Sequence, residues 1–219
     1  MKIYQYSLFE NTSNLDFKIP FTPDILFLFV SPEFTEKQEF LTSLNRKYPE
    51  AIMVGSAAYD NSGVDNPYVK KVEFTAVKID SGSIKAEYIS MDEVYTSYEA
   101  GDLLAEKLND GALNHIFLFS DGYNVKGADL LNGLRYSLLD NISITGNIPV
   151  PQSINNGFVI ANGAILKDCI LGLAIYGKQQ ENLNGHIDRF EKIGPDVLTR
   201  DTLEKILLDM ERQPQPTYS

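Results

Sequence analysis

The sequence predicts an α/β protein with two similar β-α-β-loop-β-β halves, forming mixed sheets covered by helices, plus a carboxy-terminal amphipathic helix. Three observations support this fold class. The order of strand, helix, strand and glycine occurs twice along the chain. Apolar residues follow strand and helix spacings in the matching segments. The 219 residues are 43% hydrophobic, which is enough to bury a core in one large domain or two small ones.

The repeated layout begins at "ILFLFVSPEF" and again at "HIFLFSDGYN". Residues 26–29 (LFLF) fall on residues 116–119 (IFLF), and Gly55 falls on Gly146. The offset is 90 residues at the strands (116 − 26) and 91 at the glycines (146 − 55), so it changes by one across the helix. This agreement suggests an internal duplication.

The elements follow from local patterns, beginning with "KIYQYSLF" (2–9), whose alternation predicts a first strand. LFLF and IFLF do not alternate, which is typical of central strands that are covered on both faces. Helices are predicted at about 35–47, 97–108 and 127–138, each with one apolar face. Their expected buried residues are Phe40, Leu41 and Leu44; Leu103, Leu104, Ala105 and Leu108; and Leu130, Leu131, Leu134 and Leu138.

A hairpin is predicted near the end of each half. Asn162-Gly163 is a strong two-residue hairpin signal, because both positions of the favoured turn need a positive φ, and Ser81-Gly82 is a weaker one. Towards the carboxyl terminus, Asp201 precedes apolar residues at helical spacing, which predicts an amphipathic helix that the prolines of "QPQPTYS" end. The apolar positions of this helix are Leu203, Ile206, Leu207 and Met210.

The charge balance argues against several classes of partner. Nineteen basic and thirty acidic side chains give a net charge of −11, and no cluster of Lys and Arg could neutralise phosphates in a row. We therefore expect no nucleic acid and no membrane surface as a partner. With no charged and apolar leader and no apolar run long enough to cross a bilayer, we expect a cytoplasmic protein.

Few residues could support nucleophilic or metal chemistry. Cys169, the single cysteine, lies in an apolar run and is expected to be buried, and a disulfide framework is excluded. His115 is expected at a strand start and His186 in a polar loop, and neither is near Cys169 in the sequence. Distant residues can still converge, so a catalytic site stays open. No ligand spacing or phosphate loop occurs, and we expect neither metal nor cofactor.

The loops after the strands are the best candidate for a ligand site. Ligands of open α/β sheets bind beyond the carboxyl ends of the strands, which here are residues 54–63, 119–127 and 144–157. These loops are rich in small polar side chains and tyrosine, a lining that suits binding of a small polar molecule. For each glycine alone, a plain turn remains an equal alternative. The candidate ligand-binding residues are Gly55, Ser56, Tyr59, Asp121, Gly122, Tyr123, Gly146, Asn147 and Gln152.

Several of these segments resemble the FIST amino-terminal sensory domain of signal-transduction proteins. "HIFLFSDGYNVKGADLLNGL" is similar to that family's strand, Asp-Gly turn and Gly-x-x-Leu-Leu-x-Gly-Leu helix, and "ISITGNI" is similar to the strand before its Gly-Gly-x-x-Gly-Asp loop. "DILFLFVSPEF", "MVGSAA" and "SYEAGDLLAEKL" also resemble the family, in the same order across about residues 23–177. The chain departs from the pattern where "GSAA" lacks a cysteine and "GNIPVP" keeps only the first glycine.

The resemblance implies a sensory domain over residues 1–185, with halves of about 1–95 and 96–180. Residues 186–219 would then be a linker and helix toward a missing or separate output domain. It also implies a small-molecule ligand, possibly an amino acid or similar metabolite, and a signalling output domain or protein as partner. The expected function is therefore sensing without catalysis.

Two other functions remain open. A hydrolase could use Asp121 as the base with Tyr123 as a helper. Alternatively, the predicted helix at 201–212 could give an interaction scaffold or a homodimer through its apolar face, although packing on the domain's own sheet explains that face as well.

Overall fold

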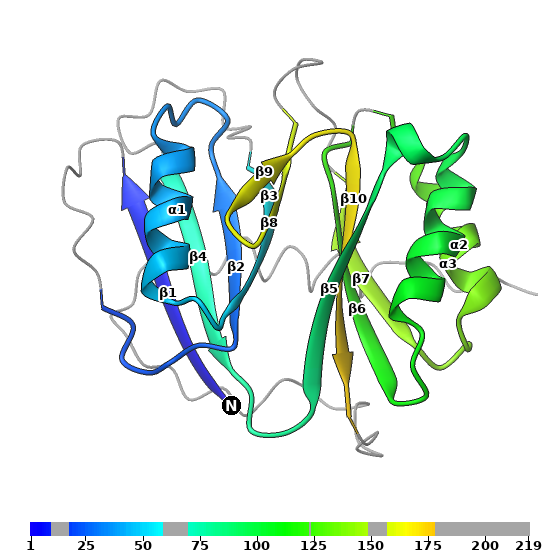
Figure 1. The fold of residues 1–219 in the computed structure, drawn as a ribbon, viewed down its shortest axis with the longest axis horizontal. Helices are drawn as coiled ribbons and strands as arrows, with labels where there is room; N and C mark the ends of the chain where they lie inside the picture. Colours follow the sequence, from blue (N-terminus) through cyan, green and yellow to red (C-terminus); the bar gives the residue numbers. More distant parts are fainter. Residues whose placement is uncertain (10–17, 59–69, 123, 149–156, 178–219) are drawn as a thin grey trace, which may run out of the picture.

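The chain folds into four layers, in the order helix, sheet, sheet and helices (Figure 1). The structure is a computed structural model that describes residues 1–9, 18–58, 70–122, 124–148 and 157–177. Helix α1 (Lys37–Lys47) covers the outer face of a six-stranded sheet. Helices α2 (Ser97–Leu108) and α3 (Gly127–Ser137) cover the outer face of a four-stranded sheet. The predicted mixed sheets covered by helices are confirmed, and the predicted carboxy-terminal helix lies outside the described residues.

The six-stranded sheet is mixed. In order across the sheet its strands are β1 (Lys2–Phe9), β4 (Lys70–Lys78), β2 (Ile25–Val30), β3 (Ile52–Ala57), β8 (Val159–Ala161) and β9 (Ala164–Leu166). Strands β2 and β3 are parallel, and each of the other neighbouring pairs is antiparallel. The apolar run at residues 26–29 lies in β2, an inner strand, as its lack of alternation predicts.

The four-stranded sheet repeats the parallel pair. Its strands, in order, are β5 (Ser83–Ser90), β10 (Cys169–Tyr176), β6 (Leu113–Ser120) and β7 (Ser143–Asn147). Strands β6 and β7 are parallel, whereas β10 is antiparallel to both of its neighbours. Leu118 pairs with Gly146 here, just as Leu28 pairs with Gly55 in the other sheet. The two sheets therefore share the same register at their central pair.

The two halves exchange strands. Strand β5 follows β4 in the chain but pairs with β10 in the other sheet, so the predicted hairpin at Ser81-Gly82 is wrong and this segment is a crossover between sheets. The Asn162-Gly163 hairpin is confirmed, with φ of 47° and 84°, and it joins β8 to β9. This hairpin extends the sheet of the first half, and the chain then returns to the second sheet as β10. Sequence pattern showed the strands but not which sheet each one joins.

Three apolar layers fill the spaces between the four layers. One lies under α1, one under α2 and α3, and the third lies between the two sheets. The layer between the sheets includes the ring pair of Phe27 and Phe117, whose centroids are 5.3 Å apart. Most of the predicted helix core is confirmed, but Leu131 is 42% exposed because it lies beside the stripe that α3 buries.

Helices α2 and α3 cross at two glycines. A Cβ atom at Gly133 would lie 1.9 Å from the carbonyl oxygen of Tyr98, and one at Gly101 would lie 2.2 Å from that of Leu130. Helix α2 begins at a variant of the capping box, in which the N–H of Glu99 donates to Oγ1 of the N-cap residue Thr96 and Oε2 of Glu99 accepts from the N–H of Tyr95 rather than that of Thr96. No helix within the described residues has the length and apolar character needed to span a bilayer.

Candidate functional site

The carboxyl ends of the parallel strands of both sheets meet at one edge of the molecule. The N–H of Ala58 donates to the carbonyl of Val30 at 2.9 Å, which joins the ends of β3 and β2. The N–H of Ala57 donates to the carbonyl of Phe158 at 3.0 Å. The preceding residue, Gly157, lies so close to the end of β6 that a Cβ there would be 2.4 Å from the carbonyl oxygen of Asp121. The chain at 157–158 thus bridges the two sheets at this carboxyl edge (Figure 1).

Buried polar side chains gather at this edge. The described residues include four of them, Ser56, Ser97, Ser120 and Asp121. Three lie at the ends of β3 and β6, with exposed fractions of 0%, 0% and 2% for Ser56, Ser120 and Asp121. A buried polar group needs a hydrogen-bond partner, and Oγ of Ser120 accepts from the N–H of Gly122 at 3.0 Å. Gly122 has a φ of 80°, a conformation that favours glycine.

Asp121 fixes the turn that leads into β10. Its Oδ2 accepts a hydrogen bond from the backbone N–H of Asp168, a residue with a φ of 50°. The side chain of Asp168 in turn accepts from Nδ2 of Asn124 at 3.0 Å, and its carbonyl accepts from the N–H of Met91 at 2.6 Å. The carboxylate of Asp121 therefore has a structural role in linking β6 to β10.

Gly55 and Gly146 allow close approach between neighbouring strands. A Cβ would lie 1.8 Å from the carbonyl oxygen of Leu28 at Gly55, and 2.1 Å from that of Leu118 at Gly146. Gly55 shares its face with Met53 and Ala57, which pack in the layer under α1, and Gly146 shares its face with Ile144, which packs under α2 and α3. The two glycines therefore face opposite outer layers, and packing alone explains both.

The remaining candidates are placed only in part. Asn147 is the last residue of β7 and pairs with Phe119, so its backbone lies at the carboxyl edge. Tyr59, Tyr123 and Gln152 lie outside the described residues. Of the sequence-predicted set, the structure brings together Ser56, Asp121 and Gly122. The backbone at 157–158 connects them, because Phe158 bonds to the end of β3 and Gly157 lies against Asp121.

Cys169 and His115, two of the side chains considered for nucleophilic chemistry, are neutral at neutral pH, and His186 lies outside the described residues. Burial, and then the nearby Asp121 carboxylate, raises the pKa of the Cys169 thiol to about 11, and the thiol donates to the carbonyl of Lys167 at 3.0 Å. A thiol with a raised pKa is a poor nucleophile. His115, expected at the start of a strand, is the third residue of β6, and its Nε2 is 2.8 Å from Oγ1 of Thr145.

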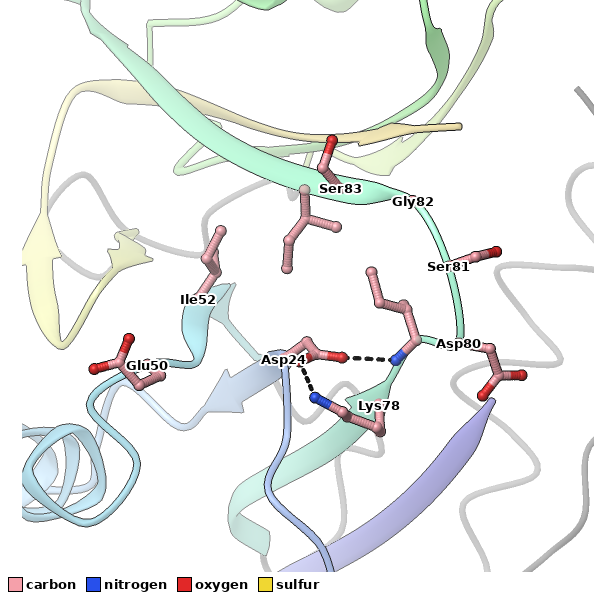
Figure 2. A pocket seen from close by; sticks show the side chains of 10 residues that line it. Asp24, Glu50, Ile52, Lys78, Asp80, Ser81, Gly82 and Ser83 are labelled. Atoms are coloured by element: carbon pink, nitrogen blue, oxygen red, sulfur yellow. Dashed lines mark hydrogen bonds and ion pairs between the residues drawn. The ribbon is translucent and has the colours of Figure 1, made fainter. Parts of the chain in front are cut away.

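A hollow of about 430 Å³ opens at the opposite edge, where β2 and β3 begin. Figure 2 shows Asp24 beside Lys78 in this hollow, with Ser83 above them. Nζ of Lys78 is 2.5 Å from Oδ1 of Asp24, and the N–H of Ile79 donates to Oδ2 at 2.8 Å. We call this the amino-edge hollow. Within the described residues, no group of three or more His, Cys, Asp and Glu side chains is placed to hold a metal ion.

The family model of the FIST N domain matches residues 24–200. The chain belongs to the FIST N domain family. The resemblance seen in the sequence is thereby confirmed, and FIST N domains are sensory domains of signal-transduction proteins. No protein with a curated description matches the sequence.

Sequence reasoning missed two features of this FIST N domain. The first is the role of Asp168, which depends on its left-handed backbone conformation. The only signal for it in the sequence is the residue type, an aspartate two residues after the short strand β9. The amino-edge hollow depends on the crossover from β4 to β5 between sheets. No local pattern identifies a crossover, because the same residues would suit a hairpin.

Proposed function

We propose that this FIST N domain binds a small polar metabolite at the carboxyl edge and that binding is its sensory event. The observation that carries the proposal is the meeting of strand ends from both sheets at one edge, bridged by residues 157–158. A ligand there contacts both sheets at once, so its occupancy can change how the two sheets pack.

The chemistry of the edge favours binding over catalysis. Asp121 is occupied with the N–H of Asp168, and the thiol of Cys169 is protonated at neutral pH. A hydrolase needs a base within reach of its substrate, and the structural role of Asp121 gives that alternative little support. We therefore propose a non-catalytic site that includes Ser56, Gly122 and Asn147 among its polar groups.

The ligand class follows from the edge and from the family. Small hydroxyl and amide groups offer hydrogen bonds of both kinds without a strong net charge, which suits an amino acid or a similar metabolite. The output partner is a signalling domain or protein that responds to the carboxy-terminal residues 186–219. We propose an intracellular place of action, where such metabolites are abundant.

A thermal-shift screen of amino acids and related metabolites tests this function. A ligand at about a hundred times its dissociation constant should add about 2.7 kcal/mol to the free energy of unfolding. Asn147→Ala should reduce that stabilisation, because it removes the side-chain amide of a residue whose backbone ends β7 at the carboxyl edge. Asn141→Ala, an exposed asparagine before β7, is the matched control and should leave the shift unchanged.

Hydrogen exchange tests the sensory step separately. With ligand bound, amide protection should change in residues 200–212 as well as at the strand ends. A ligand that stabilises the wild type and both variants equally would count against the carboxyl edge as its site. Saturation without any change in residues 200–212 would remove the relay while leaving the binding intact.

A further inference from the structure

The amino-edge hollow has the volume of a small-molecule site and a mixed polar and apolar lining. Its volume of about 430 Å³ falls within the range of about 300–1,000 Å³ typical of small-molecule pockets. Ile52, Ile79 and Ile84 line it and belong to the apolar layer between the two sheets, where each is only partly buried. The hollow thus exposes apolar surface between the sheets, beneath a polar rim.

The rim has more acidic than basic groups. Asp24 is paired with Lys78, and Asp80 is paired with the amino group of Met1. Among the described residues, Glu50 at the rim makes no ion pair and no hydrogen bond. In Figure 2, Glu50 lies at one side of the hollow and Asp80 at the other, with Asp24 and Lys78 between them. One carboxylate therefore remains for a ligand cation.

We infer that the amino-edge hollow is a second ligand site, which binds a small primary amine with a short apolar chain. The apolar chain contacts the isoleucines, and the ammonium group lies at the rim near Glu50. A carboxylate on the ligand is disfavoured, because Asp24 already occupies the single cation among the described lining residues, Lys78. The expected ligand is thus an amine without a carboxylate, unlike the ligand proposed for the carboxyl edge.

The place of this hollow suits a sensor. Residues 79–82 connect the two sheets and line the hollow, so a bound molecule contacts the crossover itself. Gly82 in that crossover has a φ of 96°, and a Cβ there would lie 2.3 Å from the carbonyl oxygen of Tyr176. Tyr176 is the last residue of β10, from which the chain continues toward its carboxyl terminus. A bound molecule can therefore change the contact between Gly82 and Tyr176, at the point where the chain leaves the second sheet.

Nuclear magnetic resonance titration of the full chain with n-butylammonium chloride tests the inference. The amide signals of Ile79, Gly82 and Ser83 should shift in a saturable manner. L-Norvaline, which is butylamine with a carboxylate added, should bind there at least about threefold more weakly, and so should n-butanol, which lacks the charge. Glu50→Gln should weaken n-butylammonium binding about threefold, the scale of a solvent-exposed ion pair. Glu36→Gln, an exposed glutamate at the opposite edge, should leave it unchanged.

Three results would overturn the inference. One is the absence of saturable shifts at those amides, and another is equal binding of n-butylammonium and n-butanol. The third is nuclear Overhauser contacts from residues 178–219 to Ile52 and Ile84, which would mean that the chain itself fills the hollow. Shifts by L-norvaline at Ser56 and Gly122, with no shifts by n-butylammonium at Ile79, Gly82 and Ser83, would support the proposed function while rejecting this second site.

Discussion

The fold strongly affects the ionisation of His115. Its ring lies on β6, 4.4 Å from the ring of Phe117 between centroids, and 2.8 Å separates its Nε2 from Oγ1 of Thr145. Burial lowers the pKa of the imidazole from 6.5 to about 4. The folded protein therefore holds His115 neutral at pH values where the unfolded chain protonates it.

His115 should make the protein less stable in mild acid. Because the folded pKa lies below the unfolded pKa, its contribution is complete above about pH 6.5 and is lost as the pH falls toward 4. The loss between pH 7 and pH 4.5 should be about 2 to 3 kcal/mol. Urea unfolding gives the free energy of unfolding of the wild type and of His115→Gln at both pH values. The difference between the two proteins should change by this amount from pH 7 to pH 4.5. An equal pH dependence of the two proteins would contradict the role of His115.

Single residues were predictable when their role was local. Cys169 was expected to be buried, because it lies in an apolar run, and it is 4% exposed. His115 was expected at a strand start and is the third residue of β6, but its partner Thr145 could not be predicted, because Thr145 lies on β7, which follows later in the chain. The surroundings of the candidate ligand-site residues were equally hard to predict, since their neighbours in space come from other strands.

At the scale of elements, the crossing of α2 and α3 depends on the absence of side chains at Gly101 and Gly133. Both glycines place backbone against backbone, with no room for a Cβ atom. The apolar layer below is buried by both helices together. The two helices therefore form one closely packed unit on the second sheet.

Gly133→Ala should destabilise the protein although alanine is the better helix former. The gain in helix propensity is about 1 kcal/mol, whereas a Cβ at 1.9 Å from the carbonyl oxygen of Tyr98 forces the helices apart. Such overpacking typically costs about 1 to 3 kcal/mol. Because the obstacle here is backbone, we expect a cost of about 3 kcal/mol, which leaves a net loss of about 2 kcal/mol after the gain in propensity. Chemical denaturation measures this loss. Asn132→Ala, an exposed position on the same helix, should cost nothing, and equal stability of the two variants would reject the crossing constraint.

The bounds of elements followed well from sequence, but their partners did not. The first strand, β1, and helix α2 agree with prediction at both ends, since alternation and an apolar stripe at helical spacing are local signals. The hairpin at Asn162-Gly163 was correct because its turn needs two residues with positive φ. The hairpin predicted at Ser81-Gly82 was wrong, because a turn sequence is the same whether the two strands pair with each other or join different sheets.

For the whole molecule, the layer between the two sheets determines cooperativity. It joins strands of both sheets, including Val54 of β3 and Leu173 of β10, each with an exposed fraction of 0%. Because the sheets have no other large apolar contact surface for these faces, neither is expected to stay folded when this layer opens. The sensory role proposed above depends on the same layer.

Leu173→Ala should weaken both sheets together. Truncation of a fully buried leucine typically costs about 2 to 5 kcal/mol, and the cavity would lie between the sheets. Hydrogen exchange should show an equal fall in protection for β2 and β6, which lie in different sheets. Leu139→Ala, at a position that is 67% exposed, should change neither. Loss of protection in β6 with β2 unchanged would mean that the sheets unfold independently.

The exchange of strands has a consequence for any attempt to divide the protein. Cleavage of the peptide chain near residue 95 would leave the first fragment with β5 but without its partner β10, and the second with β8 and β9 but without their neighbour β3. Neither fragment is an autonomous folding unit, yet each holds the strand that the other lacks. The interlocked halves are thus suited to reassembly from two separately produced pieces, and a genetic fusion or permutation has to preserve both exchanged segments.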